Sequence, residues 1–100
     1  MEKKESLFLI VQTDVAPEME EEFNRWYDEE HIPRLLQVPG VRMAKRGRNT
    51  GIGPKYIALY EHEHPEVQHS SAYKLAVETP WTQKIRPYLR NFEKKVYSAL

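Results

Sequence analysis

The sequence predicts an α+β fold in which strands and helices follow in the order β-α-β-β-α-β. Three observations lead to this fold: an apolar strand near the start of the chain, two segments with helical spacing of apolar residues, and later strand segments that are either aromatic or charged. This order defines the ferredoxin-like arrangement. We therefore expect a four-stranded antiparallel sheet with its helices on one face, its first and third strands central and its second and fourth strands at the edges.

The length and composition are those of one globular domain. A chain of 100 residues can bury one hydrophobic core but not two, so we expect a single domain over residues 1–100. Lys plus Arg and Asp plus Glu both number 15, and this balance argues against a nucleic-acid partner. The absence of cysteine excludes disulfides and thiolate metal sites.

The apolar segments are short. None approaches the length of about 20 residues that a membrane-spanning helix needs. Residues 1–5 carry mixed charge and precede an apolar run over residues 7–11, which is too short for the core of a signal peptide. We therefore expect a cytoplasmic protein with no membrane partner.

The first strand and helix follow from apolar spacing. Residues 6–14 predict a strand that is apolar on both faces, as a covered central strand should be. A helix begins near Pro17, since proline fits the first helical turn. Its apolar stripe consists of Met19, Phe23, Trp26, Tyr27 and His31. We expect Ile32-Pro33 to break or kink this helix, because the residue before proline is disfavoured in helical conformation. A short turn over 33–36 follows.

The remaining elements have clear boundaries in the sequence. Strands are expected over 41–47, 55–64 and 91–97, and lysines and arginines in the first and last of these fit edge strands. Ser70 or Ser71 caps a helix that runs to about residue 78, with Ala72, Leu75 and Ala76 facing inward. Thr79-Pro80 begins a further short helical turn.

Helices on one face would leave the other face of the sheet open. Ile57 and Leu59 of the third strand then need a cover. For a domain of this size we expect that cover to be a second copy of the chain, which makes the protein a homodimer.

His31 is the first candidate for chemistry. It ends the apolar stripe of the first helix, where an imidazole can act as a general acid or base. A histidine in that place can equally be a core or capping residue. Tyr27 lies one helical turn before it, so the two side chains can approach each other. Tyr60, on the third strand, is the third candidate catalytic residue.

Other side chains are candidates for substrate binding. Trp26 and Trp81 can form aromatic walls, and Arg86 can contact an anion. His62 is interpreted as pocket or interface lining. The same aromatic residues also fit an ordinary core, so a pocket and a packed interior remain alternatives.

Two histidines at strand spacing, His62 and His64, raise the alternative of a metal site. With His31 or His69 and a carboxylate they could hold zinc or iron. Because the sequence does not specify the third ligand, we expect no metal and no cofactor.

The stretch Phe23-Asn-Arg-Trp-Tyr-Asp-Glu-Glu-His-Ile-Pro33, followed by Val38-Pro-Gly-Val41, resembles the EthD-like group of the dimeric α+β barrel superfamily. The segment from Thr79 to Phe92 is similar to small, uncharacterised members of that group. The resemblance implies a homodimer whose two sheets form a barrel, with a pocket between the sheet and the helices of each subunit. It also assigns the family's helix-end histidine to His31 and its aromatic neighbours to Trp26 and Tyr27. The chain departs from many relatives at Met43, where an aromatic residue is common, and in lacking the cysteine that some isomerase relatives use.

The leading hypothesis is a cofactor-independent enzyme, a lyase, isomerase or cyclase, that acts on an aromatic, polyketide-like or lactone substrate. His31 would move a proton, and Tyr27 and Tyr60 would hydrogen-bond the developing oxyanion. Two alternatives stay open. One is a non-catalytic ligand-binding or assembly module on the same dimeric fold, and the other is a cofactor-free or metal-dependent monooxygenase.

Overall fold

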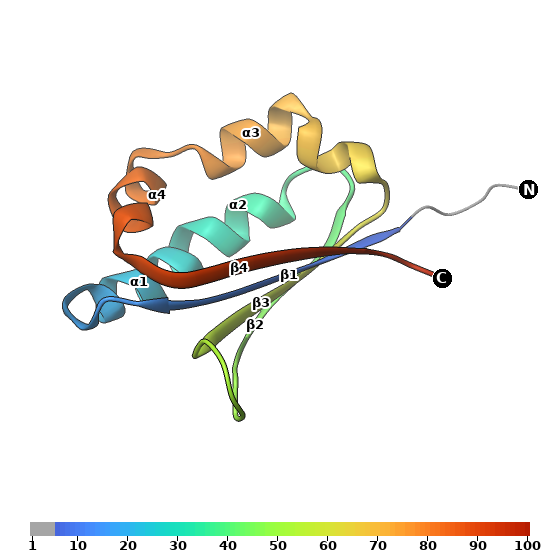
Figure 1. Cartoon of the computed structure of the whole chain (residues 1–100). Helices are drawn as coiled ribbons and strands as arrows, with labels where there is room; N and C mark the ends of the chain where they lie inside the picture. Colours follow the sequence, from blue (N-terminus) through green and yellow to red (C-terminus); the bar gives the residue numbers. More distant parts are fainter. Residues whose placement is uncertain (1–5) are drawn as a thin grey trace, which may run out of the picture.

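A four-stranded antiparallel sheet carries a layer of short helices on one face (Figure 1). This computed structural model describes residues 6–100, so the charged residues 1–5, which entered the expectation of a cytoplasmic location, lie outside it. The strands are β1 (Leu7–Val15), β2 (Val41–Arg48), β3 (Tyr56–His62) and β4 (Leu89–Ser98). Their order in the sheet is β2-β3-β1-β4. The expected central and edge strands are therefore confirmed, and with them the ferredoxin-like arrangement.

Two helical connections cross the same face of the sheet (Figure 1). The first contains η1 (Pro17–Met19), α1 (Glu20–Trp26), η2 (Tyr27–His31) and α2 (Ile32–Leu36), and the second contains η3 (Pro65–His69), α3 (Ser71–Val77), α4 (Pro80–Ile85) and η4 (Arg86–Tyr88). Side-chain caps begin α3 and α4: Ser70 Oγ accepts the Tyr73 N–H at 3.2 Å, and Thr79 Oγ1 accepts the Thr82 N–H at 3.0 Å. Among the described residues, no helix has both the length and the apolar character required to cross a membrane.

The first helix does not break at Pro33, contrary to the expectation from sequence. Ile32 keeps helical backbone angles (φ −63°, ψ −48°), and α2 continues through the proline. The distortion lies one turn earlier, where η2 is a π-helical turn. Proline lacks the N–H that bonds to the preceding turn and its ring crowds the carbonyl there. The wider π-turn relieves this conflict, so the chain stays helical.

The inward face of α3 also differs from the expectation. Ala72 is exposed and Leu75 is 70% exposed, whereas Ala76 is buried as expected. Tyr73 and Val77 share the inward side with Ala76 and pack against the core. The large Tyr73 ring decides the rotation of this short helix, because it packs edge-on against His62 at 5.6 Å between ring centroids. β3 ends at His62, so His64 lies outside the strand.

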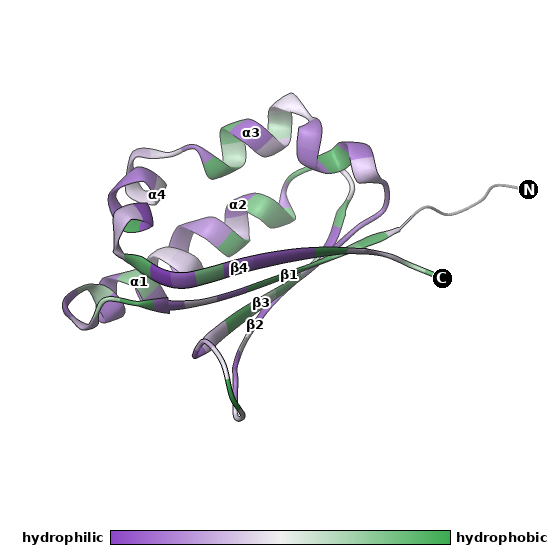
Figure 2. Ribbon diagram, viewed as in Figure 1, coloured by the Kyte–Doolittle hydropathy of each residue, from purple (hydrophilic) through white to green (hydrophobic). Residues whose placement is uncertain are grey.

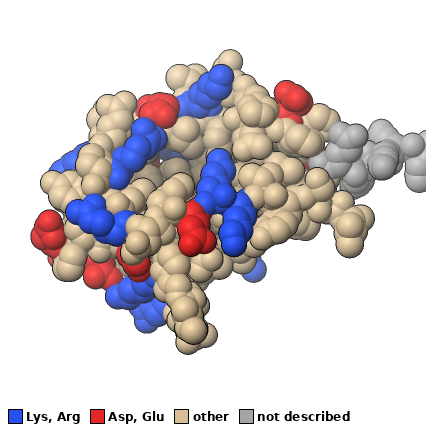
Figure 3. Space-filling view, viewed as in Figure 1, with Lys and Arg blue, Asp and Glu red and all other residues tan. Residues whose placement is uncertain are grey.

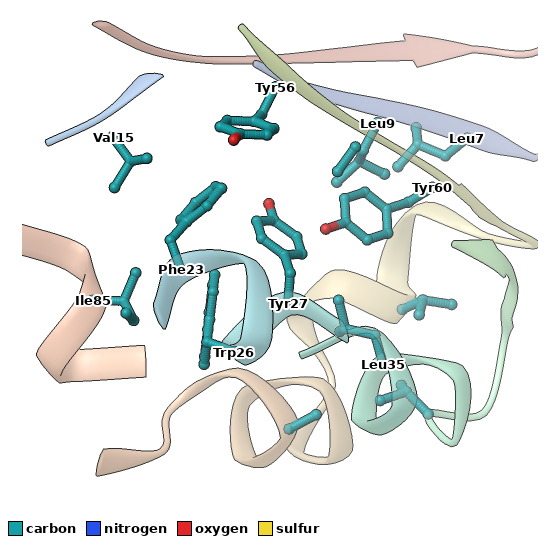
Figure 4. Close-up of a cluster of buried hydrophobic side chains, with 14 residues drawn as sticks. Leu7, Leu9, Val15, Phe23, Trp26, Tyr27, Leu35, Tyr56, Tyr60 and Ile85 are labelled. Carbon is teal, nitrogen blue, oxygen red and sulfur yellow. The ribbon is translucent and has the colours of Figure 1, made fainter. Parts of the chain in front are cut away.

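The core lies between the helix layer and the two central strands. Alternate residues of β1 and β3 point into it, as the strand period requires. They meet the aromatic stripe of α1 and η2, as Figure 4 shows. The main contributors are Leu7, Leu9, Phe23, Trp26, Tyr27, Leu35, Tyr56, Tyr60 and Ile85.

Within residues 6–100, no helix covers the opposite face of the sheet (Figure 1). Phe8 and Tyr97 are cross-strand neighbours there, 38% and 48% exposed, and Ile10 and Leu59 form a second pair. Figure 2 shows the apolar character concentrated along β1 and β3, with the edge strands more hydrophilic. The uncovered face therefore has an apolar centre between polar edges.

Gly40, immediately before β2, gives a stability prediction. Its φ is +96°, and a Cβ there would lie 2.5 Å from Val67 Cγ2. Gly40→Ala should lower the free energy of unfolding by about 1–3 kcal/mol, because backbone strain and a clash act together. Gly51→Ala is the matched control, since the nearest atom is Asn49 Oδ1 at 3.7 Å, and it should change stability by less than about 0.5 kcal/mol. Chemical denaturation of both variants checks this, and equal effects would contradict it.

Candidate active site

A cavity of about 230 Å³ lies between the sheet and the helix layer. This is slightly below the roughly 300–1,000 Å³ of typical small-molecule pockets, so it suits a small ligand. Five of the seven expected site residues line it: Trp26, Tyr27, His31, Tyr60 and Arg86. Most of the remaining wall is apolar. The sequence left a pocket and a solid core as alternatives, and the structure contains both, side by side.

The π-turn η2 brings three rings of the site together. In a regular α-helix, residues i and i+5 project about 140° apart. Here Trp26 and His31 stack, with ring centroids 4.4 Å apart and planes at 25°. Tyr27 meets His31 edge-on at 5.2 Å. The extra residue in the turn thus turns His31 over the indole and into the cavity wall.

His31 is set up as a neutral imidazole. Burial, reinforced by the positive charge of Arg86, lowers its pKa from 6.5 to about 4. Its Nδ1 atom is buried and has no hydrogen-bond partner within residues 6–100. At neutral pH the ring is therefore uncharged, and it can accept a proton from a bound molecule.

Tyr27 and Tyr60 both line the cavity, and their hydroxyl groups point toward each other (Figure 4). Burial raises the pKa of Tyr27, while the neighbouring Tyr60 hydroxyl and the charge of Arg46 oppose that rise. Burial raises the pKa of Tyr60 further, well above its usual value, and its neighbour Tyr27 adds to the effect. Both hydroxyls are consequently neutral at neutral pH and available as donors, and Tyr27 is the more acidic of the two.

Arg46 contacts a site residue without lining the cavity, and the sequence reasoning missed it. Its guanidinium lies 4.5 Å from the centre of the Tyr27 ring. It donates to Asp28 Oδ1 at 2.9 Å and to Asn24 Oδ1 at 2.6 Å, which fixes it over the ring. The sequence favoured an exposed position for Arg46, because this charged residue lies on an expected edge strand. Arg46 is paired with Ala58, whose side chain is buried, so Arg46 lies on the side of β2 that faces the helices.

A chain of hydrogen bonds fixes the Trp26 indole, and it too was missed from sequence. Trp26 Nε1 donates to Thr82 Oγ1 at 3.2 Å, and the hydroxyls of Thr79 and Thr82 are 3.0 Å apart. Thr79 Oγ1 then donates to Glu30 Oε2 at 2.5 Å. The capping threonine of α4 therefore also orients the surface on which His31 stacks.

Two expected wall residues lie outside the cavity lining. Trp81 points from the start of α4 toward α1, and its Nε1 donates to Glu22 Oε2 at 3.1 Å. His62 is 1% exposed, lies further along β3 and faces Tyr73 instead. Burial and the charge of Lys94 lower its pKa. Trp81 and His62 are therefore not part of the wall of this cavity.

The alternative metal site gains no support from the described part of the chain. Residues 6–100 contain no group of three His, Asp or Glu side chains arranged to hold a metal ion. His64 instead caps η3, where its Nδ1 accepts the Glu66 N–H at 3.1 Å.

Comparison with known proteins agrees with this fold. No known sequence family and no curated protein matches the chain. The chain is similar to a solved structure of a candidate antibiotic biosynthesis monooxygenase from Nitrosomonas europaea, with a TM-score of 0.72 and 11% identity over 100% of this chain and 95% of that one. It is also similar to an EthD family protein from Bacillus halodurans, with a TM-score of 0.68 and 17% identity over 95% of this chain and 99% of that one. A third similar structure is a dabb family protein with a ferredoxin-like fold from Mesorhizobium loti, with a TM-score of 0.67 and 16% identity over 96% of this chain and 98% of that one. At these identities the comparisons show a shared fold, the ferredoxin-like arrangement, which is the fold that the resemblance to EthD-like proteins implied.

The depressed pKa of His31 predicts a pH-dependent stability. The unfolded chain binds a proton near pH 6.5, but the folded chain binds it only near pH 4, so falling pH favours unfolding within that window. Relative to His31→Gln, the wild type should lose up to about 3 kcal/mol of unfolding free energy between pH 7 and pH 4. Denaturation at a series of pH values measures this. His69→Gln, which alters an exposed side chain, should follow the wild type, and parallel curves for His31→Gln would contradict the prediction.

Proposed function

We propose that the protein is a cofactor-independent enzyme that removes a proton from a small aromatic, polyketide-like or lactone substrate. The product of that step would lead to an isomerase, lyase or cyclase reaction. The observation that carries the proposal is a neutral His31 imidazole that shares one small, largely apolar cavity with a pair of tyrosine hydroxyls.

Each group has a role that its surroundings support. His31 takes a proton from a carbon next to a substrate carbonyl, and negative charge develops on the carbonyl oxygen. Tyr27 and Tyr60 donate hydrogen bonds to that oxygen, and such bonds are stronger against a largely apolar wall than in water. Trp26 holds the plane of the imidazole by stacking. The imidazolium then returns the proton to another atom of the substrate.

The names of the similar structures favour a second candidate function. Several are named as candidate monooxygenases, including the protein from Nitrosomonas europaea. A carbanion formed by His31 is also a species that dioxygen can oxidise, so both functions share the proton abstraction. Dioxygen consumption during turnover separates them.

Exchange of carbon-bound hydrogen tests the proton abstraction without knowledge of the natural substrate. In D₂O the wild type should accelerate deuterium uptake at the acidic carbon of anthrone or 1-tetralone, followed by NMR. His31→Gln should lower this rate by about 10² to 10⁴, the range for loss of a general base.

Matched variants make that result specific. Tyr27→Phe should lower the exchange rate by roughly 10² or more, the effect of losing an oxyanion donor. His69→Gln should leave it unchanged. Exchange by His31→Gln at the wild-type rate, or none by the wild type, would instead favour a non-catalytic binding module.

We also propose that the protein is a homodimer in which a second copy covers the open face of the sheet. Phe8, Ile10, Leu59 and Tyr97 form the apolar centre of that face. A second copy fits this surface because its own apolar centre and polar edges are the same. Two-fold symmetry pairs such self-complementary surfaces.

A charge placed in the apolar centre should dissociate the dimer. Leu59→Lys should shift the sedimentation-velocity mass from dimer to monomer, because an unpaired ammonium is costly to bury. Ile52→Lys is the matched control, since Ile52 is fully exposed at the tip of the β2–β3 loop and should leave the mass unchanged. Circular dichroism verifies that both variants fold. A wild type that sediments as a monomer would contradict the proposal.

A further inference from the structure

The charged side chains that line the cavity are both basic. Arg86 from η4 and Lys94 from β4 line it, and no Asp or Glu of the described chain does. Figure 3 shows basic side chains on this face beside the hollow, with acidic side chains close to them. The cavity wall therefore presents two cations, two tyrosine hydroxyls and a neutral imidazole on an otherwise mostly apolar surface.

We propose that the cavity binds a small aromatic carboxylate, with its acidic group held by Arg86 and Lys94 and its ring against Trp26 and Phe92. This inference rests on the proposed function and names the substrate class of the same site. An aromatic ring fits walls of indole and phenyl groups. A carboxylate fits a guanidinium and an ammonium, since both donate charge-assisted hydrogen bonds.

The two cations are free to take a ligand. Lys94 makes no ion pair or hydrogen bond with any side chain among residues 6–100, although it projects on the side of β4 that faces the helices. Arg86 contacts Glu78 at 3.4 Å, but these side chains are 55% and 51% exposed. An exposed pair at this distance contributes little, so a ligand carboxylate can replace Glu78.

Both positive charges act on the interior of the protein. Arg86 contributes to the lowered pKa of His31, and Lys94 contributes to that of His62. An anion bound between them would cancel part of this field. The pKa of His31 should therefore rise when the carboxylate binds, which makes the imidazole a stronger base while the substrate is in place. The other titratable groups that line the cavity, Tyr27, Tyr60 and Tyr73, have raised pKa values and stay neutral near pH 7.

Fluorescence of Trp26 provides a direct binding assay. The chain has two tryptophans, so Trp81→Phe leaves only the one that lines the cavity. In that background, benzoate, 4-hydroxybenzoate and 1-hydroxy-2-naphthoate are titrated against the corresponding primary amides at pH 7. At least one acid should bind roughly tenfold or more tightly than its amide, as expected for a hydrogen-bonded charge.

Single substitutions identify the groups responsible. Arg86→Gln and Lys94→Gln should each weaken binding of the acid by roughly tenfold and leave binding of the amide unchanged. Lys74→Gln removes an equal charge from an exposed position on α3, outside the cavity lining, and should change neither. NMR titration of the His31 Cε1–H, assigned with His31→Gln, should show a higher pKa with the acid bound than with the amide.

The outcomes separate this inference from the function on which it rests. Equal affinity for acid and amide overturns the carboxylate, while proton abstraction from neutral ketones remains testable by deuterium exchange. Failure of every acid to bind also overturns it. Equal losses in Arg86→Gln, Lys94→Gln and Lys74→Gln would show a general charge effect and overturn the assigned contacts.

Discussion

The geometry of the candidate site depends on one local constraint, the π-turn at Tyr27–His31. A regular helix would direct His31 away from Trp26, whereas the extra residue in this turn stacks the two rings at 4.4 Å. The turn lies directly before Ile32-Pro33. Pro33, which disfavours a regular helix, is therefore two residues from His31, whose side chain the π-turn positions. The proline and the position of the imidazole are therefore linked through the π-turn between them.

Burial and charge act together in the cavity. Removal from water alone disfavours imidazolium and phenolate, and Arg86 adds to the effect on His31. Arg46 acts in the opposite sense on Tyr27, since its charge stabilises the phenolate. The two arginines come from different elements, β2 and η4, and each lies near one member of the acid–base set. The site thus combines a neutral base with hydroxyls of unequal acidity.

The sequence was sufficient to predict the fold, because strand order and edge charge follow from patterns of a few residues. It also placed His31, Tyr27 and Tyr60 among candidate site residues, since helical spacing and strand alternation position them. The predictions from sequence failed where contacts between distant segments decide which way a side chain points. The rotation of α3 follows from the contact of Tyr73 with His62, and the inward position of Arg46 follows from its pairing with the buried Ala58 of β3. Neither contact has a signature within its own segment.

The hydrogen-bond chain from Trp26 through Thr82 and Thr79 to Glu30 joins the connection between β1 and β2 to the connection between β3 and β4. The bonded residues lie far apart in the sequence: Trp26 and Thr82 are 56 positions apart, and Glu30 and Thr79 are 49 positions apart. Closing so long a loop costs conformational entropy, which the contacts between the two connections must offset. A nascent or partly folded chain would hold the helix that bears the imidazole without a fixed indole beneath it. Competence of the site is therefore a property of the complete domain, acquired when its second half docks.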